Sequence, residues 1–183
     1  MKSALIAAAA LMAALPAVAG GLVSTQRPET QTTGVIGVGS SAFAPGAAIP
    51  LKYSTWGQNI SPPLKWTTVG AAKSYAILVD DPDGPDPQPV SHWAAWNIPA
   101  GVTVATEGAQ LGVQGINSHR SLGYSGPHPP AADPPHHYHF QVLALDRMLN
   151  LPAGAERDAL LAAAKGHVIA KGEVVGTFKA PRG

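Results

Sequence analysis

Two stretches of the 183-residue chain decide its fold: SYAILV at residues 74–79 and HHYHFQVLAL at residues 136–145. The first is an apolar run of strand length, which predicts a strand buried on both faces. It leads directly into a turn with the sequence DPDG at residues 81–84. In the second stretch, the two-residue period of a β-strand places His136 and Tyr138 on one face and the odd-numbered histidines on the other.

The rest of the chain has the rhythm of an all-β protein. Short apolar stretches such as Trp93–Ile98 alternate with clusters of Pro, Gly and Asp, which favours an antiparallel β-sandwich. One segment, Ala155–Lys165, is rich in Ala and Leu and is closed by Gly166, which predicts a short helix. A last strand is expected over Val168–Phe178. The prediction is a mostly β fold with a few short peripheral helices.

The N-terminus has the features of an export signal. Lys2 precedes an apolar run over residues 4–15, and residues 17–19 (AVA) match the small-residue pattern of a cleavage site. We therefore expect a signal peptide over residues 1–19, cleavage near Ala19, and a periplasmic or secreted protein. Residues 20–42 are rich in Gly, Ser and Thr and are expected to form a flexible lead-in. The remaining length fits one domain.

Charge and cysteine content exclude several functions. The chain carries 12 basic and 11 acidic side chains with no basic cluster, which argues against nucleic-acid binding. It has no cysteine, which excludes thiolate metal sites and cysteine nucleophiles. No cofactor is indicated.

Two polar segments, Asp80–Pro85 and Gly126–Tyr138, carry most of the candidate functional side chains. Six of the seven histidines lie between His92 and His139, and prolines cluster in both segments. Loops at the same end of a sandwich converge, so we expect one rigid pocket with a few polar groups on apolar walls. Such a pocket predicts the binding of a small ligand.

These residues also suggest three more specific kinds of site. His137 and His139, with His128 and Asp133 nearby, could chelate zinc or copper, but no third ligand stands at a fixed spacing, and no metal site is predicted. The sequence GYSG at residues 123–126 is followed by prolines and not by a helix, so it is no nucleophile elbow. Acid–base catalysis by a pair such as Asp81 and His136 stays open, because such pairs also occur in binding sites.

The ordered set of motifs resembles the phosphatidylethanolamine-binding protein (PEBP) family, and in particular its bacterial Raf-kinase-inhibitor-like branch of YbhB/YbcL type. The motifs that carry the resemblance are SPPLKW at 61–66, DPDGP at 81–85, His92-Trp93, GPHPP at 126–130 and HHY at 136–138. The similarity extends over nearly the whole expected mature chain, so residues 43–183 are predicted to form one PEBP-like domain with an antiparallel β-sandwich.

The resemblance implies a small anion site that accepts phosphate-like groups such as phospholipid head groups. Asp81 and Asp83 would lie at the rim, with Asp81 facing inward, and His92 would form one side. Gly126, Pro129 and Pro130 would form the floor and wall of the pocket. His136 and Tyr138 would form the side opposite His92. Two departures from the family pattern, His128 and His137, add imidazoles near the site, which predicts tighter anion binding below about pH 6.

A zwitterion such as phosphoethanolamine would explain acidic residues in an anion site. Its ammonium would meet Asp81, and its phosphate would meet His136, Tyr138 and backbone N–H groups near Gly126. The resulting hypothesis is an exported, non-catalytic binding protein for a small anionic or zwitterionic ligand. The alternatives are a hydrolase that uses Asp81 and His136, and a modulator of a periplasmic or host protein. The resemblance also suggests a homodimer, which nothing in the residues demands.

Overall fold

The computed structural model describes residues 21–182, and they form two antiparallel sheets. The larger sheet has the strand order β6-β4-β3-β7-β8, and the smaller one β1-β2-β5. This confirms the prediction of a mostly β sandwich. The strands are β1 Val38–Gly39, β2 Leu64–Trp66, β3 Ser74–Asp81, β4 Val90–Pro99, β5 Val104–Ala105, β6 Val113–Gln114, β7 His136–Leu145 and β8 Val168–Phe178. The helices are α1 Arg157–Ala164 and three 3₁₀ turns, η1 Ser24–Gln26, η2 Pro28–Thr30 and η3 Leu51–Tyr53.

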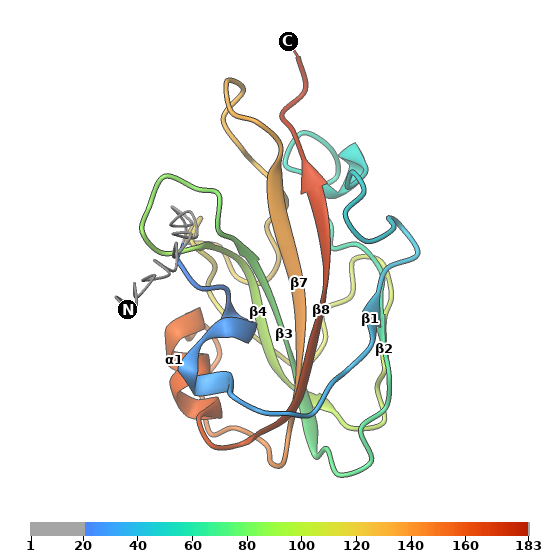
Figure 1. Cartoon of the computed structure of the whole chain (residues 1–183), viewed down its shortest axis with the longest axis vertical. Coiled ribbons are helices and arrows are strands. Elements are labelled where there is room, and N and C mark those ends of the chain that lie inside the picture. The colour runs from blue at the N-terminus through green and yellow to red at the C-terminus, as the bar shows by residue number, and fades with distance from the viewer. Residues whose placement is uncertain (1–20, 183) are drawn as a thin grey trace, which may run out of the picture.

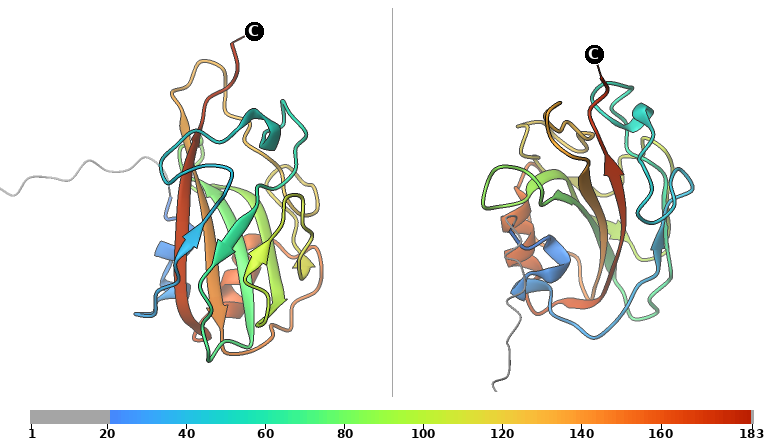
Figure 2. Two further views of the ribbon diagram at one scale, coloured as in Figure 1. Left: turned by 90° about the vertical axis from the view of Figure 1, so that its right-hand side faces the viewer. Right: turned by 45° about the horizontal axis from the view of Figure 1, so that its top comes forward.

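The five-stranded sheet is covered on both faces (Figures 1 and 2). On one face, alternate residues of β3 such as Tyr75 and Ile77 join a hydrophobic cluster with residues of the small sheet such as Trp66. On the other face, Ala76 and Leu78 join a second cluster with residues of α1. Every residue of β3 is buried, as expected for a central apolar strand.

The predicted bounds of β7 and β8 match the structure, and the period of two in β7 is confirmed. Tyr138, Phe140 and Val142 face the cluster shared with the small sheet. Leu143 and Leu145 face the cluster shared with α1. The polar start of β7 is thereby placed at one end of the sheet, close to the end of β3.

The predicted helix is also present, as α1. Leu160 and Leu161 bury its apolar side against the sheet. Gly166 follows it with a φ of +79°, a conformation that glycine adopts without a steric penalty.

The N-terminal segment differs from its expectation. Residues 20–42 were expected to be a flexible lead-in, whereas in the described part of this segment η2 contacts α1 and η1 contacts β7 and β8 (Figure 1). Ser24 is fully buried, and its N–H and hydroxyl both donate to Asp80, at 2.7 and 2.6 Å. A buried carboxylate requires such donors, which explains why a segment poor in apolar residues is held on the sheet. The signal peptide expected over residues 1–19 lies outside the described residues. Within residues 21–182, no helix has the length and hydropathy of a membrane span.

One irregularity in strand pairing positions the functional residues. Val79 pairs with Trp93, but the next residue, Asp80, pairs with Ser91, so His92 is an extra residue in β4. Such a β-bulge changes which face of the sheet the neighbouring side chains occupy. His92 therefore contacts Tyr138 on the small-sheet side, while Ser91 lies with Asp80 on the side of α1.

Candidate functional site

Asp81 and His136 form the centre of the candidate site. Asp81 ends β3 and His136 begins β7, the neighbouring strand, so the two side chains meet at one end of the sheet. The Nδ1 atom of His136 lies 2.8 Å from Oδ2 of Asp81, and both residues are only 3% exposed. A buried carboxylate beside an imidazole favours the charged form of both partners.

The surroundings of His136 raise its pKa. Burial alone would lower it, but the hydrogen bond and the charge of Asp81, together with Asp133 and Asp83, outweigh that effect. Asp133 lies on the opposite side of the ring, with Oδ2 3.4 Å from Nε2. The imidazole of His136 therefore stands between two carboxylates, and a ligand that replaces Asp133 would meet a protonated Nε2.

The hydroxyl of Tyr138 is buried without a hydrogen-bond partner. Burial and the negative charge of Asp81 raise the pKa of Tyr138 well above its ordinary value, so the hydroxyl keeps its proton. An unpaired buried hydroxyl costs about 1–3 kcal/mol, and it is seldom left so in a native protein. The Asp81 carboxylate and the backbone of His128 lie close enough to influence this hydroxyl, but neither forms a hydrogen bond of ordinary length with it.

His92 supplies an acceptor. Its Nδ1 lies 2.8 Å from the carbonyl oxygen of Ser125, and since a carbonyl only accepts, Nδ1 carries the hydrogen. Burial lowers the pKa of His92 to about 4, so the ring is neutral at ordinary pH. Its Nε2 then carries a lone pair. The ring packs edge-on against Tyr138, with 5.1 Å between centroids.

Gly126 is packed closely against the backbone of Tyr53, and the two prolines that the resemblance implies as floor and wall differ in exposure. A Cβ at Gly126 would lie 2.1 Å from the carbonyl oxygen of Tyr53, so only glycine fits this close approach. Pro129 is buried and Pro130 is exposed. The N–H of Gly126 itself donates to Asn59 Oδ1 at 2.7 Å, so a ligand would have to use other N–H groups near it.

Asp83 lies at the rim and is turned toward His137. Its Oδ2 accepts hydrogen bonds from the backbone N–H of His137 at 2.7 Å and pairs with the ring Nδ1 at 2.8 Å. Both side chains are solvent-exposed. This contact fastens the 81–84 turn to the start of β7, so Asp83 supports the site without facing its centre.

The comparisons with known proteins identify the family. The model of the family described as "Phosphatidylethanolamine-binding protein" matches residues 39–179. The chain belongs to the phosphatidylethanolamine-binding protein family. A UPF0098 protein of Pyrococcus horikoshii is 45% identical over 150 residues, which cover 76% of this chain and 75% of the relative. This PEBP-family chain also shares its fold with solved structures.

Two of these structures cover about four-fifths of the chain. A structure titled as a PEBP homologue of Chlamydia trachomatis has a TM-score of 0.76 and 38% identity, and covers 81% of this chain and 100% of its own. The structure of E. coli YbcL, titled a member of the mammalian PEBP family, has a TM-score of 0.75 and 30% identity, and covers 80% and 99%. The family match over residues 39–179 includes β3, β4 and β7, the strands that carry the candidate site.

Several residues around the candidate site of Asp81, His92, His136 and Tyr138 were not predicted from the sequence. The ring of His119 lies 5.3 Å from that of His92, and Trp56 stacks on His128 at 4.6 Å. Burial, and secondarily His128, lowers the pKa of His119. The only sequence signal for His119 was its place among the six clustered histidines. Nothing in the sequence pointed to Trp56 or Asn59, since both come from a loop far from the site in the chain.

The residues considered for a metal site and for a nucleophile elbow are arranged differently from what those sites require. His139 pairs with Glu173 at 3.1 Å and His137 pairs with Asp83, so the two histidines have separate partners. Among residues 21–182, no three His, Cys, Asp or Glu side chains are grouped as a metal site. Ser125 is buried, its N–H donates to the His92 carbonyl, and the next element in the chain is strand β7 and not the helix that a nucleophile elbow requires.

Proposed function

We propose that this PEBP-family chain is an exported, non-catalytic binding protein for a small phosphate-bearing ligand, and that a zwitterion such as phosphoethanolamine fits best. The observation that carries the proposal is the free hydroxyl of Tyr138 beside the Asp81–His136 pair. A ligand oxygen would give this hydroxyl the partner that the protein does not supply.

The set of donors and acceptors supports a ligand of mixed charge. Tyr138 and the protonated Nε2 of His136 are donors suited to phosphate oxygens. Asp81 and the lone pair of His92 Nε2 are acceptors, suited to an ammonium group or to a hydrogen of the ligand. A plain anion uses only the two donors, whereas phosphoethanolamine uses the donors and the acceptors.

Ligand entry requires a local movement. Asp81, His92, His136 and Tyr138 are each 3% exposed or less, so the cluster is closed. Asp133 is the partly exposed side chain on the outer side of His136, and its 3.4 Å contact is long for a charge-assisted hydrogen bond. We infer that a phosphate displaces Asp133 from Nε2, with the loop before β7 moving outward.

A catalytic role for the same pair is less well supported. Both ring nitrogens of His136 face carboxylates, Nδ1 at 2.8 Å from Asp81 and Nε2 at 3.4 Å from Asp133, so neither is open to a substrate proton in this arrangement. No nucleophile is positioned beside it among the residues described above. We therefore infer binding without turnover, in the periplasm or outside the cell. A protein partner or a second copy of the chain would be an addition to this activity.

Calorimetric titration tests the proposal. Inorganic phosphate and phosphoethanolamine are titrated into the purified protein, and turnover of a phosphomonoester is measured in parallel. We expect saturable binding of both, tighter for phosphoethanolamine, and no turnover above that of the Asp81→Asn variant. Turnover that depends on Asp81 would favour the hydrolase, and the absence of any saturable heat would contradict the binding function.

A further inference from the structure

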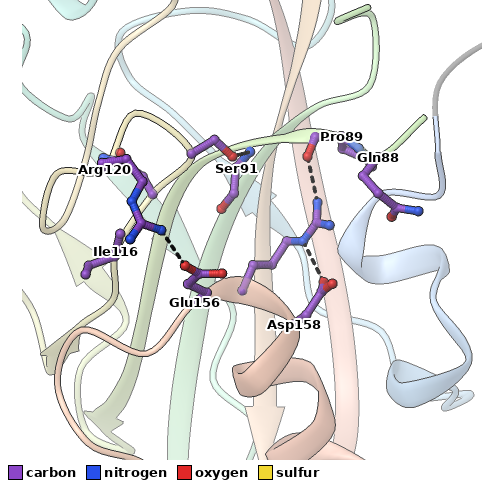
Figure 3. Close-up of a pocket in the computed structure, with 10 residues that line it drawn as sticks. Gln88, Pro89, Ser91, Ile116, Arg120, Glu156 and Asp158 are labelled. Carbon is purple, nitrogen blue, oxygen red and sulfur yellow. Dashed lines mark hydrogen bonds and ion pairs between the residues drawn. The ribbon is translucent and has the colours of Figure 1, made fainter. Parts of the chain in front are cut away.

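A second polar cavity lies on the other face of the five-stranded sheet, beside the N-terminus of α1 (Figure 3). Its volume is about 260 Å³. The β-bulge at His92 creates the separation between the two sites, because Ser91 pairs directly with Asp80 and faces α1. The residues that line the cavity and carry its chemistry are Ser91, Asn117, Arg120, Glu156, Arg157 and Asp158.

The hydroxyl of Ser91 lies beneath the surface of the cavity and has no partner in the protein. Ser91 is 6% exposed, and its Oγ has no hydrogen-bond partner. Figure 3 shows Ser91 at the back of the cavity, between Arg120 with Glu156 on one side and Asp158 on the other. An unpaired buried hydroxyl that lines a polar cavity is an independent sign of a missing partner.

Arg157 forms the base of the cavity and is itself 7% exposed. Its Nη1 donates to the carbonyl oxygen of Pro89 at 3.0 Å, and its Nε donates to Asp158 at 3.2 Å. Nη1 also lies 3.6 Å from Oδ1 of Asp80, an oxygen without a hydrogen-bond partner. The guanidinium is thus fixed, while Asp80 Oδ1 and Ser91 Oγ are left to be satisfied.

The charges of the cavity select among ligand classes. Two arginines and two carboxylates, those of Glu156 and Asp158, line the cavity, and the buried Asp80 lies behind Arg157, so a free anion would meet no excess of positive charge. Guanidinium groups only donate and carboxylates only accept, whereas a hydroxyl does both. Adjacent donor-only and acceptor-only groups are therefore best bridged by the hydroxyls of an uncharged molecule.

We propose that this cavity binds a small neutral polyol of about the size of a monosaccharide. Its hydroxyls would accept from Arg120 and Arg157, donate to Glu156 or Asp158, and pair with Ser91. Ile116 and Pro89 offer apolar contact for the carbon skeleton. The volume lies below the usual range for drug-sized ligands, which is consistent with a single sugar ring. This cavity is separate from the proposed phosphate site at Asp81, His136 and Tyr138, and the proposal for it does not depend on that site.

The test is a nuclear magnetic resonance titration of the full protein with glucose, mannose, ribose, glycerol and myo-inositol. We expect at least one of them to shift the Ser91 amide and the Arg157 Nε–H signals saturably, with no change at the His136 ring. Ser91→Ala should weaken that binding about tenfold, as for the loss of one hydrogen bond, without lowering stability. Arg120→Gln, at an exposed position, should also weaken it, whereas Arg147→Gln, outside the cavity, should not.

Three results would overturn the proposal. The first is that none of the five polyols shifts the Ser91 and Arg157 signals, which would leave only bound water at the cavity. The second is that acetate or sulfate shifts these signals at lower concentration than every polyol. The third is that Ser91→Ala and Arg120→Gln bind the polyol as tightly as the parent chain. Because His136 reports on the other site, each result is distinguishable from a failure of phosphate binding.

Discussion

His136 and Asp81 are joined by a 2.8 Å hydrogen bond between two residues of 3% exposure, one at the start of β7 and one at the end of β3. The strands are neighbours, so the sheet itself sets this distance. Asp81 also accepts the N–H of Asp83 at 2.9 Å, which closes the turn after β3. The pair is thus built into the fold, and the buried hydroxyl of Tyr138 beside it has no hydrogen-bond partner.

Removing the Tyr138 hydroxyl should separate binding from stability. In Tyr138→Phe, the free energy of unfolding should be unchanged or higher, because an unpaired polar group is lost, while phosphate affinity should fall about tenfold. Tyr124→Phe is the matched control. Its hydroxyl donates to the Tyr53 carbonyl at 2.9 Å, so stability should fall by about 1 kcal/mol with phosphate affinity unchanged. Urea unfolding and calorimetry measure both quantities; a Tyr138→Phe chain that binds phosphate normally would contradict the assignment.

Anion affinity should depend on the protonation of His136. The pKa of His136 is raised above 6.5, the ordinary pKa of a histidine side chain. The imidazolium therefore persists above pH 6.5 and is lost as the pH rises through the raised pKa. Sulfate affinity, measured because sulfate keeps its charge across this range, should be constant at lower pH and fall through that window. A profile that stays flat, or that is unchanged in His136→Gln, would show that His136 does not face the anion.

His92 should make the protein less stable in acid. Its pKa in the fold is about 4, below the ordinary 6.5, so the unfolded chain binds a proton that the folded chain does not between these values. Stability then falls as pH drops from 6.5 toward 4, by up to about 3 kcal/mol from this residue. Urea unfolding of His92→Gln should show a smaller loss over that window. An equal loss in both proteins would mean that His92 titrates normally.

Gly126 should tolerate no side chain. A Cβ there would lie 2.1 Å from the Tyr53 carbonyl oxygen, so Gly126→Ala should lower the free energy of unfolding by about 1–3 kcal/mol. Gly70→Ala is the control, because a Cβ at Gly70 meets nothing within 4 Å, and its effect should stay within about 0.5 kcal/mol. Equal thermal stability of the two variants would argue against the close approach at Gly126.

The sequence predicted the elements better than their junctions. The two-residue period in HHYHFQVLAL was enough to place Tyr138 and Phe140 on one face, because period and burial are local properties. The bulge at His92 depends on the pairing of β3 with β4, and no local pattern encodes that register.

The N-terminal segment shows a second limit. Its polar composition favoured a flexible lead-in, but composition does not reveal a distant partner. The partner is the buried Asp80, whose carboxylate takes hydrogen bonds from both Ser24 and Gln141. Likewise, the six clustered histidines suggested a shared pocket, yet His137 and His139 pair with acidic residues outside its centre.

The central claim is that a phosphate-bearing zwitterion binds between Asp81, His136 and Tyr138. The most direct measurement is the pH titration of the His136 ring signals, with and without phosphoethanolamine, in the parent chain and in Asp81→Asn. We predict that the ligand raises the pKa of His136 further, and that Asp81→Asn weakens phosphoethanolamine more than inorganic phosphate. A bound ligand that leaves the His136 pKa unchanged, or equal losses for the two ligands, would contradict the account.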